Sequence, residues 1–186
     1  MKLLQKTLLA LAAGSMMTVG AQAAVNYGMT AQPYIGAKIG QYDLDKADDE
    51  ATSYGIYGGA KFTPNFGMEA EYMTTSDEDY DSLYEYSADV YGLYGTYDYT
   101  FPGSQMYAKG RLGVAKNKVE YDSKVSGRAD HSKSKTSVAG GLGLGYNLAP
   151  NAAVELAYDW YPEVKDAYNN KKLDANGITL GANFKF

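Results

Sequence analysis

The last ten residues of the chain, Gly177 to Phe186, read Gly-Ile-Thr-Leu-Gly-Ala-Asn-Phe-Lys-Phe. Alternate positions from Ile178 to Phe186 are apolar, and the positions between them are polar or glycine. A β-strand points successive side chains to opposite faces, so this stretch predicts a strand with one apolar face. An edge strand of a soluble sandwich would show the same alternation. A terminal aromatic is more typical of a membrane barrel, in which it faces lipid and its strand closes the sheet on the first one.

Seven further segments of the chain alternate in the same way. The predicted strands cover residues 34–42, 54–62, 67–74, 88–99, 106–116, 136–146, 153–161 and 177–186. Lengths near ten residues match a tilted crossing of a bilayer. The sequence therefore predicts an all-β fold, an eight-stranded antiparallel up-and-down transmembrane β-barrel.

The connections between these segments alternate between short and long. Pro64, Pro102 and Pro150 lie in short turns, where a missing N–H costs nothing, whereas the other four connections are longer and charged. Short turns at one end and long loops at the other are typical of outer-membrane barrels. We expect interfacial belts from aromatic residues near strand ends, namely Tyr34, Tyr54, Phe62, Tyr72, Tyr91, Tyr97, Tyr99, Phe101, Tyr158, Trp160 and Phe186.

The start of the chain has the features of a secretory signal. Lys2 and Lys6 precede an apolar stretch of small residues, and Ala21-Gln22-Ala23 follows it. We predict a signal peptide at residues 1–23, cleaved before Ala24, and a barrel domain at 24–186. A transmembrane anchor is disfavoured because the apolar stretch is short for a bilayer. These features predict export to the bacterial outer membrane.

Three segments of the predicted strands resemble a known family. Tyr34-Ile-Gly-Ala-Lys38-Ile-Gly, Phe66-Gly-Met-Glu69-Ala-Glu-Tyr72 and Tyr107-Ala-Lys-Gly-Arg111-Leu-Gly resemble strands one, three and five of the OmpA transmembrane-domain family, which includes the small OmpX-type and opacity-type barrels. The resemblance implies eight antiparallel strands, with inward charges paired in the lumen. The sequence ends at the barrel, so we do not expect the family's peptidoglycan-binding domain.

Charged residues on the polar parity are predicted to fill the lumen. An eight-stranded barrel has an interior just wide enough for side chains, and buried charges must be paired. We expect an ion network that closes the lumen, formed by Lys38, Lys61, Glu69, Glu71, Lys109, Arg111, Glu155 and Asp159. The alternative is a charged pore lining, which would make the protein a small, low-conductance channel.

Two local motifs do not support catalysis or cofactor binding. The stretch Gly140 to Gly145 is rich in glycine but is followed by Pro150 and another strand, so it lacks the helix of a dinucleotide site. Its alternate glycines are expected to give inward space beside large neighbours. His131 is the only histidine, is placed in the third long loop, and has no partners for a triad or a metal pair. We expect no enzyme, cofactor or metal, although lipid-modifying and proteolytic barrels exist.

The net charge is −5, so nothing favours nucleic-acid binding, and the absence of cysteine excludes disulfides. The first two long loops are acidic, and the third, at 117–135, is rich in Lys and Arg. Docking between these loops, or contact of a free basic loop with lipopolysaccharide phosphates, would both follow from this split.

We expect a non-enzymatic structural or surface-interaction role of the adhesion type, in a monomer. Its predicted partners are outer-membrane lipid and lipopolysaccharide, and the barrel assembly machinery. That machinery would recognise the terminal strand through Phe184 and Phe186. The sequence does not name an extracellular ligand.

Overall fold

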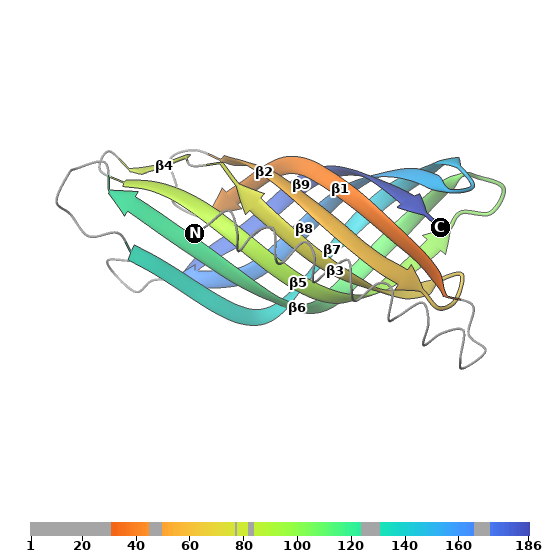
Figure 1. Ribbon diagram of the computed structural model, residues 1–186, viewed down its shortest axis with the longest axis horizontal. Coiled ribbons are helices and arrows are strands. Elements are labelled where there is room, and N and C mark those ends of the chain that lie inside the picture. The colour runs from red at the N-terminus through yellow and green to blue at the C-terminus, as the bar shows by residue number, and fades with distance from the viewer. Residues whose placement is uncertain (1–30, 45–49, 77, 82–83, 124–130, 166–171) are drawn as a thin grey trace.

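The computed structural model describes residues 31–44, 50–76, 78–81, 84–123, 131–165 and 172–186, and these residues form nine strands (Figure 1). The strands are β1 (Gln32–Leu44), β2 (Ala51–Lys61), β3 (Phe66–Thr75), β4 (Glu78–Asp81), β5 (Tyr84–Thr100), β6 (Met106–Ser123), β7 (His131–Ala149), β8 (Ala152–Lys165) and β9 (Lys172–Lys185). Among the described residues, none forms a helix long and apolar enough to cross a membrane.

Eight of the nine strands form a closed antiparallel barrel, which confirms the predicted fold class. The first strand pairs with the last, with Ile39 opposite Leu180. The remaining gap is closed by β3 and β5, with Tyr72 opposite Tyr91. The ninth strand, β4, was not predicted; it pairs only with β5 and adds a short extension at the end of the long connections.

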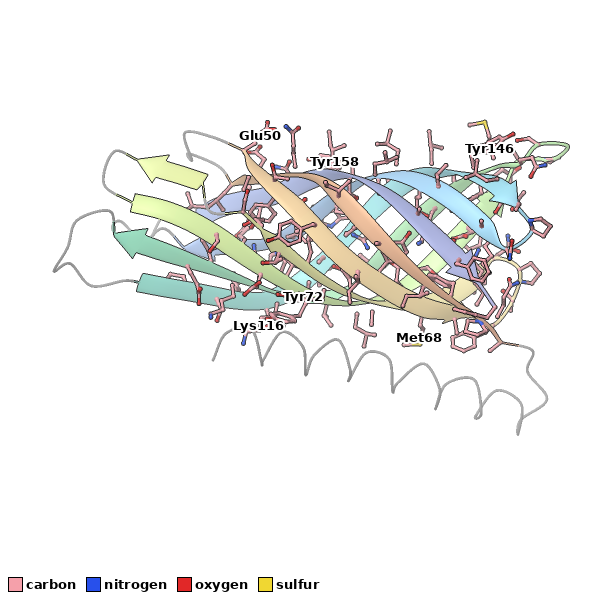
Figure 2. All side chains as sticks on the ribbon, turned by 45° about the horizontal axis from the view of Figure 1, so that its top comes forward. Glu50, Met68, Tyr72, Lys116, Tyr146 and Tyr158 are labelled. Carbon is pink, nitrogen blue, oxygen red and sulfur yellow. The ribbon has the colours of Figure 1, made fainter. Side chains whose placement is uncertain are left out.

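The period of two along each strand separates the wall from the lumen. Apolar side chains of one parity face outward and are strongly exposed, as at Leu112, Leu142 and Ile178. In Figure 2, the side chains of Met68 and Tyr146 stand out from the barrel wall. The opposite parity is buried, and it carries most of the charged residues of the strands. An apolar outer wall around a polar interior suits a barrel whose solvent is lipid.

Aromatic side chains lie at both ends of the outer wall. At the end of the short turns, Phe66 packs edge-on against Tyr97, with ring centroids 4.9 Å apart. At the other end, Tyr72 packs against Tyr91 at 5.1 Å. The expectation was wrong for Tyr34, which is 3% exposed and lies in the lumen. Tyr34 shares the inward parity of Lys38, so its ring fills the interior instead of a lipid-facing belt.

The strands run further than the sequence pattern indicated. The strands β5, β6 and β7 have 17, 18 and 19 residues, well beyond the nine to eleven that cross a bilayer. Most of the predicted third loop is therefore strand, since β6 continues to Ser123 and β7 begins at His131. His131 is thus a strand residue, not a loop residue. These three strands, with β4 beside β5, project beyond the other strands at the left of Figure 1.

The predicted signal peptide at 1–23 lies outside the described residues, as do Lys124, Arg128 and several acidic residues of the first two loops. Loop docking and the boundary between leader and barrel therefore remain predictions. The described chain enters and leaves the barrel at the end of the short turns, where the N–H of Phe186 donates to the carbonyl of Pro33.

Candidate functional site

Arg111, on β6, is the centre of the cluster of charges in the lumen. Its Nε donates to Asp159 Oδ1 at 2.6 Å, and its Nη1 donates to Glu69 Oε1 at 3.0 Å and also to Glu71. The guanidinium carbon lies 4.7 Å from the ring centroid of Tyr94. One planar cation thus connects β3 to β8 across the interior, and the fork geometry of arginine suits contact with several carboxylates.

Two lysines complete this cluster. The Nζ of Lys38, on β1, lies 2.9 Å from Glu71 and 3.5 Å from Asp159. The Nζ of Lys109 lies 2.6 Å from Glu69 and 3.4 Å from Glu155. Three cations therefore face four carboxylates in the middle of the barrel. The structure brings together seven of the eight residues named from the sequence, and Lys61 lies elsewhere.

Lumen tyrosines bind the same carboxylates from the side. The hydroxyl of Tyr34 donates to Glu69 Oε2 at 2.9 Å, and the hydroxyl of Tyr107 donates to Glu155 Oε2 at 3.1 Å. Room for Tyr107 comes from Gly145, where an added Cβ would lie 2.0 Å from the tyrosine ring. The inward glycines of β7 thus provide space beside large side chains, as predicted.

The space left within the cluster is small. A cavity of about 10 Å³ lies among Lys38, Glu69, Arg111 and Asp159, which is room for about one water. Towards the short turns the lumen widens into a mouth of about 730 Å³. Lys61 lies at this mouth and forms an ion pair with Asp98, apart from the central cluster.

The half of the lumen near the long connections is filled differently. The ring of Tyr42 stacks on that of Tyr161 with centroids 5.8 Å apart, and Asn117 Nδ2 donates to the Tyr42 hydroxyl at 2.7 Å. Around them lies a buried group that we call the apolar cap, formed by Tyr42, Leu44, Ala51, Met73, Ala88, Val90, Tyr94, Ala115, Val119, Ala139, Tyr161, Leu173 and Ala175. The cap was not predicted from the sequence. The signal that could have revealed it is the inward parity of Arg111, which continues through Ala115, Asn117 and Val119.

The pairing of β8 becomes irregular at the same level. The pairing of β8 with β9 shifts register between Tyr161 and Val164. Both Tyr161 and Pro162 are buried, and the Pro162 carbonyl accepts a hydrogen bond from Asn117 Nδ2 at 3.2 Å. After Trp160, towards its C-terminal end, β8 no longer pairs with β7. One edge of β7 is therefore left unpaired by any described strand.

No group of three or more His, Cys, Asp or Glu side chains placed to hold a metal ion is found in the described part of the chain. The structure also places Phe184 and Phe186 on the outer wall near the short turns, with ring centroids 5.4 Å apart. Both rings are exposed to the surroundings of the barrel.

A closed eight-stranded barrel with an apolar wall and a charged interior belongs to the class of transmembrane β-barrels. The sequence profile of the outer membrane protein beta-barrel domain matches residues 8–186. The chain is a member of this family of bacterial outer-membrane barrels, which confirms the resemblance seen in the sequence.

Solved structures share the fold at low sequence identity. Neisserial surface protein A aligns with a TM-score of 0.62 and 17% identity, covering 84% of this chain and 97% of that one. Ail, the attachment invasion locus protein of Yersinia pestis, aligns with a TM-score of 0.58 and 21% identity, with the same coverage. The N-terminal β-barrel domain of Pseudomonas aeruginosa OprF aligns at 0.56 and 15%, covering 82% and 97%. A search of curated proteins finds no significant match.

Proposed function

We propose that the protein is a non-enzymatic surface-interaction barrel, in which the membrane-spanning part anchors an extracellular β-extension. The observation that carries this proposal is the length of β5, β6 and β7, at 17 to 19 residues. A crossing needs about nine to eleven residues, so roughly a third or more of each strand is available outside the bilayer. We refer to this part of β5, β6 and β7, together with β4, as the extension.

The filled lumen supports an anchoring role over a conducting one. Ion pairs occupy the middle of the barrel and the apolar cap occupies the half nearest the extension. Among the structural neighbours, Ail is described as an attachment invasion locus protein, and one of its structures holds the heparin analogue sucrose octasulfate. We propose an attachment role for this chain as well, and we assign it to the extension.

Shortening the extension tests the proposal. A variant in which Asn-Gly replaces residues 120–132 joins β6 to β7 by a two-residue turn within their existing pairing, because Val119 lies opposite Lys133. We expect normal amounts of folded barrel in the outer membrane and loss of attachment when the variant is displayed on a non-adherent bacterium. Equal attachment by the shortened and complete proteins would contradict the proposal.

Conductance measurements test the channel alternative. The refolded protein in a planar bilayer should show no steady single-channel current, because the remaining cavity in the cluster holds about one water. A stable, wide conductance would replace the anchoring proposal with a channel function. Assays on phospholipid, lipid A and peptide substrates would reveal the enzymatic alternative.

We also propose that export uses residues 1–23 and that the assembly machinery recognises the terminal strand through Phe184 and Phe186. The exposed positions of both rings on the wall support this role. The substitution Phe186→Asp should leave the protein in the periplasm, whereas Phe186→Tyr should insert normally. Normal membrane levels of the Asp variant would contradict the role of this aromatic.

A further inference from the structure

The mouth of the barrel at the short turns is a cavity apart from the small space inside the ion cluster. Its volume is about 730 Å³, and sites for small ligands typically measure about 300–1,000 Å³. In Figure 1 it lies at the end of the barrel where the C-terminus is marked. Below it, the hydroxyl of Tyr107 donates to Glu155 at 3.1 Å, and the cavity inside the cluster holds about one water. The mouth is therefore a cup with a closed floor.

Two lysines border this mouth from the strands on either side of β1. Lys61, on β2, lies opposite Gln32, and Lys185, on β9, lies opposite Tyr34. Adjacent strands are about 4.8 Å apart, so the Cα atoms of the two lysines are on the order of 10 Å apart. Each ammonium group stands on a flexible four-carbon stem. Both groups can therefore contact one small anion placed between them.

Lys185 has no counterion in the described part of the chain. Its Nζ donates to the neutral Asn147 Oδ1 at 2.8 Å, whereas Lys61 is paired with Asp98. Phe186 is 70% exposed, which leaves the terminal carboxylate to the solvent. A partly buried cation without an anion is unfavourable, because it has lost hydration and gained no opposite charge. The mouth therefore favours a ligand that carries a negative charge.

Asp98, beside the lysines, lacks a hydrogen-bond donor. It is 3% exposed and belongs to the lining of the mouth. Its Oδ2 pairs with Lys61, and its Oδ1 is buried without a hydrogen-bond partner among the described residues. A buried acceptor without a donor keeps its desolvation cost, and a donor from a ligand removes that cost. The lining therefore suits an anion that also carries a hydrogen-bond donor.

A hydroxyl group is a better donor for this place than an ammonium group. An ammonium group would bring a third cation beside Lys61 and Lys185, and like charges at close range repel. A hydroxyl group donates to Asp98 without that repulsion, and it can also exchange hydrogen bonds with Thr100, another residue of the lining. The mouth thus favours a hydroxylated anion over a zwitterion.

We propose that the mouth binds a small hydroxylated anion of the class of sugar acids and hydroxy acids. Lys185 and Lys61 bind its carboxylate, and Asp98 accepts a hydrogen bond from one of its hydroxyl groups. The short turns of outer-membrane barrels face the periplasm, so the ligand reaches the cup from that compartment. The site lies at the end of the barrel opposite the extension, and it does not rest on the proposed attachment function.

Three matched probes separate the effect of charge from that of hydroxyl groups. Glucuronate carries both, glucose carries only the hydroxyl groups, and hexanoate carries only the carboxylate. The complete protein in phosphatidylcholine nanodiscs would be titrated with each probe, and amide chemical shifts would be followed by NMR. We expect glucuronate to bind about tenfold more tightly than the other two, since each lacks a charge-assisted hydrogen bond, with shifts at Thr100, Asn147 and Lys185. Equal affinity for hexanoate or for glucose, or no binding of glucuronate, would overturn the proposal.

Lys185→Gln tests the unpaired cation without touching the ion pair of Lys61 and Asp98. Glutamine keeps an amide donor, so the barrel should fold and keep its heat-modifiable migration on gels. The variant should bind glucuronate about tenfold more weakly and glucose as before. The matched control is Lys116→Gln, which lies opposite Tyr91 near the other end of the barrel and should bind normally. Equal losses in the two variants, or no loss in either, would contradict the site.

Asp98→Ala tests the contact with the hydroxyl group. Without the acceptor, the affinities for glucuronate and hexanoate should come within about threefold of each other. If Asp98 acted through its charge alone, the substitution would strengthen the binding of both anions equally. A ratio that stayed near tenfold would therefore show that the hydroxyl groups are recognised elsewhere, and the proposal would fail.

Other occupants of the mouth are outcomes of the same experiment. Phosphatidylglycerol also has hydroxyl groups beside an anion, so a loss of glucuronate binding in nanodiscs of this lipid would mean that a headgroup occupies the mouth instead of a free solute. Binding only by a variant that starts at Ala31 would mean that preceding residues occupy it. Either result would overturn the proposal. The variant with Asn-Gly in place of residues 120–132 should bind glucuronate normally, so a failure of attachment and a failure of this site are distinguishable.

Discussion

The middle of the lumen and the half near the long connections are both filled by side chains, but different interactions hold them. In the middle, Arg111, Lys38 and Lys109 face four carboxylates from opposite walls. In the half near the long connections, the apolar cap packs around Tyr42 and Tyr161. An ion cluster depends on the identity of every member, because removing one charge strands another. An apolar cluster depends on volume, and similar volumes substitute for one another.

One residue joins the two regions. The hydroxyl of Tyr161 lies 3.4 Å from Asp159 Oδ2 and 3.5 Å from the sulfur of Met73. Its ring belongs to the cap and its hydroxyl reaches the ion cluster. A change at Tyr161 would therefore act on both regions.

The largest effect is expected at the centre of the ion cluster. Arg111→Ala leaves Glu69, Glu71 and Asp159 without their shared cation and should lower the free energy of unfolding by about 3–5 kcal/mol. Arg111→Met should not recover this loss, because volume does not replace charge. Urea unfolding in lipid vesicles measures both values. The control is Lys118→Ala at a more exposed ion pair, for which a change of about 0–1 kcal/mol is expected.

A cavity in the apolar cap should cost less than the lost arginine. Leu173 is fully buried, and Leu173→Ala should destabilise the barrel by about 2–4 kcal/mol. Here Leu173→Met should recover most of the loss, with a remaining cost of less than about 1.5 kcal/mol. The same unfolding assay applies. A Met variant as unstable as the Ala variant would show that the two regions do not differ in the proposed way.

An added methyl group tests how tightly the lumen is packed. Gly145→Ala places a Cβ in the ring of Tyr107 and should cost about 1–3 kcal/mol. The matched control is Gly110→Ala on the outer wall, where the nearest atom to an added Cβ is 3.9 Å away. The control should be near neutral. Combining Gly145→Ala with Tyr107→Ala should give less than the sum of the two losses, and simple additivity would argue against the contact.

The smallest effect is expected at the mouth of the barrel. Lys61 pairs with Asp98, but its side chain is 18% exposed and it borders the mouth of about 730 Å³. Water entering this mouth can solvate Asp98, so Lys61→Gln should cost only about 1 kcal/mol. If unfolding experiments gave a loss as large as for Arg111→Ala, the mouth would belong energetically to the central cluster.

The alternation of residues predicted the fold and most side-chain directions correctly. The outward Leu112 and Leu142 and the inward Glu69 and Arg111 follow from a period of two alone. The error at Tyr34 arose because an aromatic near a strand end was assigned to a lipid-facing belt against its own parity. Parity was the better guide, since a one-residue shift would turn every side chain of the strand to the other face.

The extension was harder to predict because its composition resembles that of a loop. The stretch from Glu120 to Lys135 is rich in Lys, Ser and Asp, and it lacks the apolar parity that lipid imposes on a strand. Outside the bilayer both faces of a strand meet water, so the alternation that identifies a membrane strand disappears. The regular structure of its described part comes from continued pairing of β6 with β7, up to Tyr121 opposite His131.

The sequence by itself determined that the strands alternate, that charges point inward and that aromatics gather near the membrane surfaces, because these features depend only on local periodicity and solvent. The tertiary structure decided which charges meet, since Lys38 and Asp159 come from strands far apart in the chain. It also decided that an apolar cap fills the half of the lumen near the long connections. Both depend on the tilt and register of eight strands closed into one barrel, which no single segment encodes.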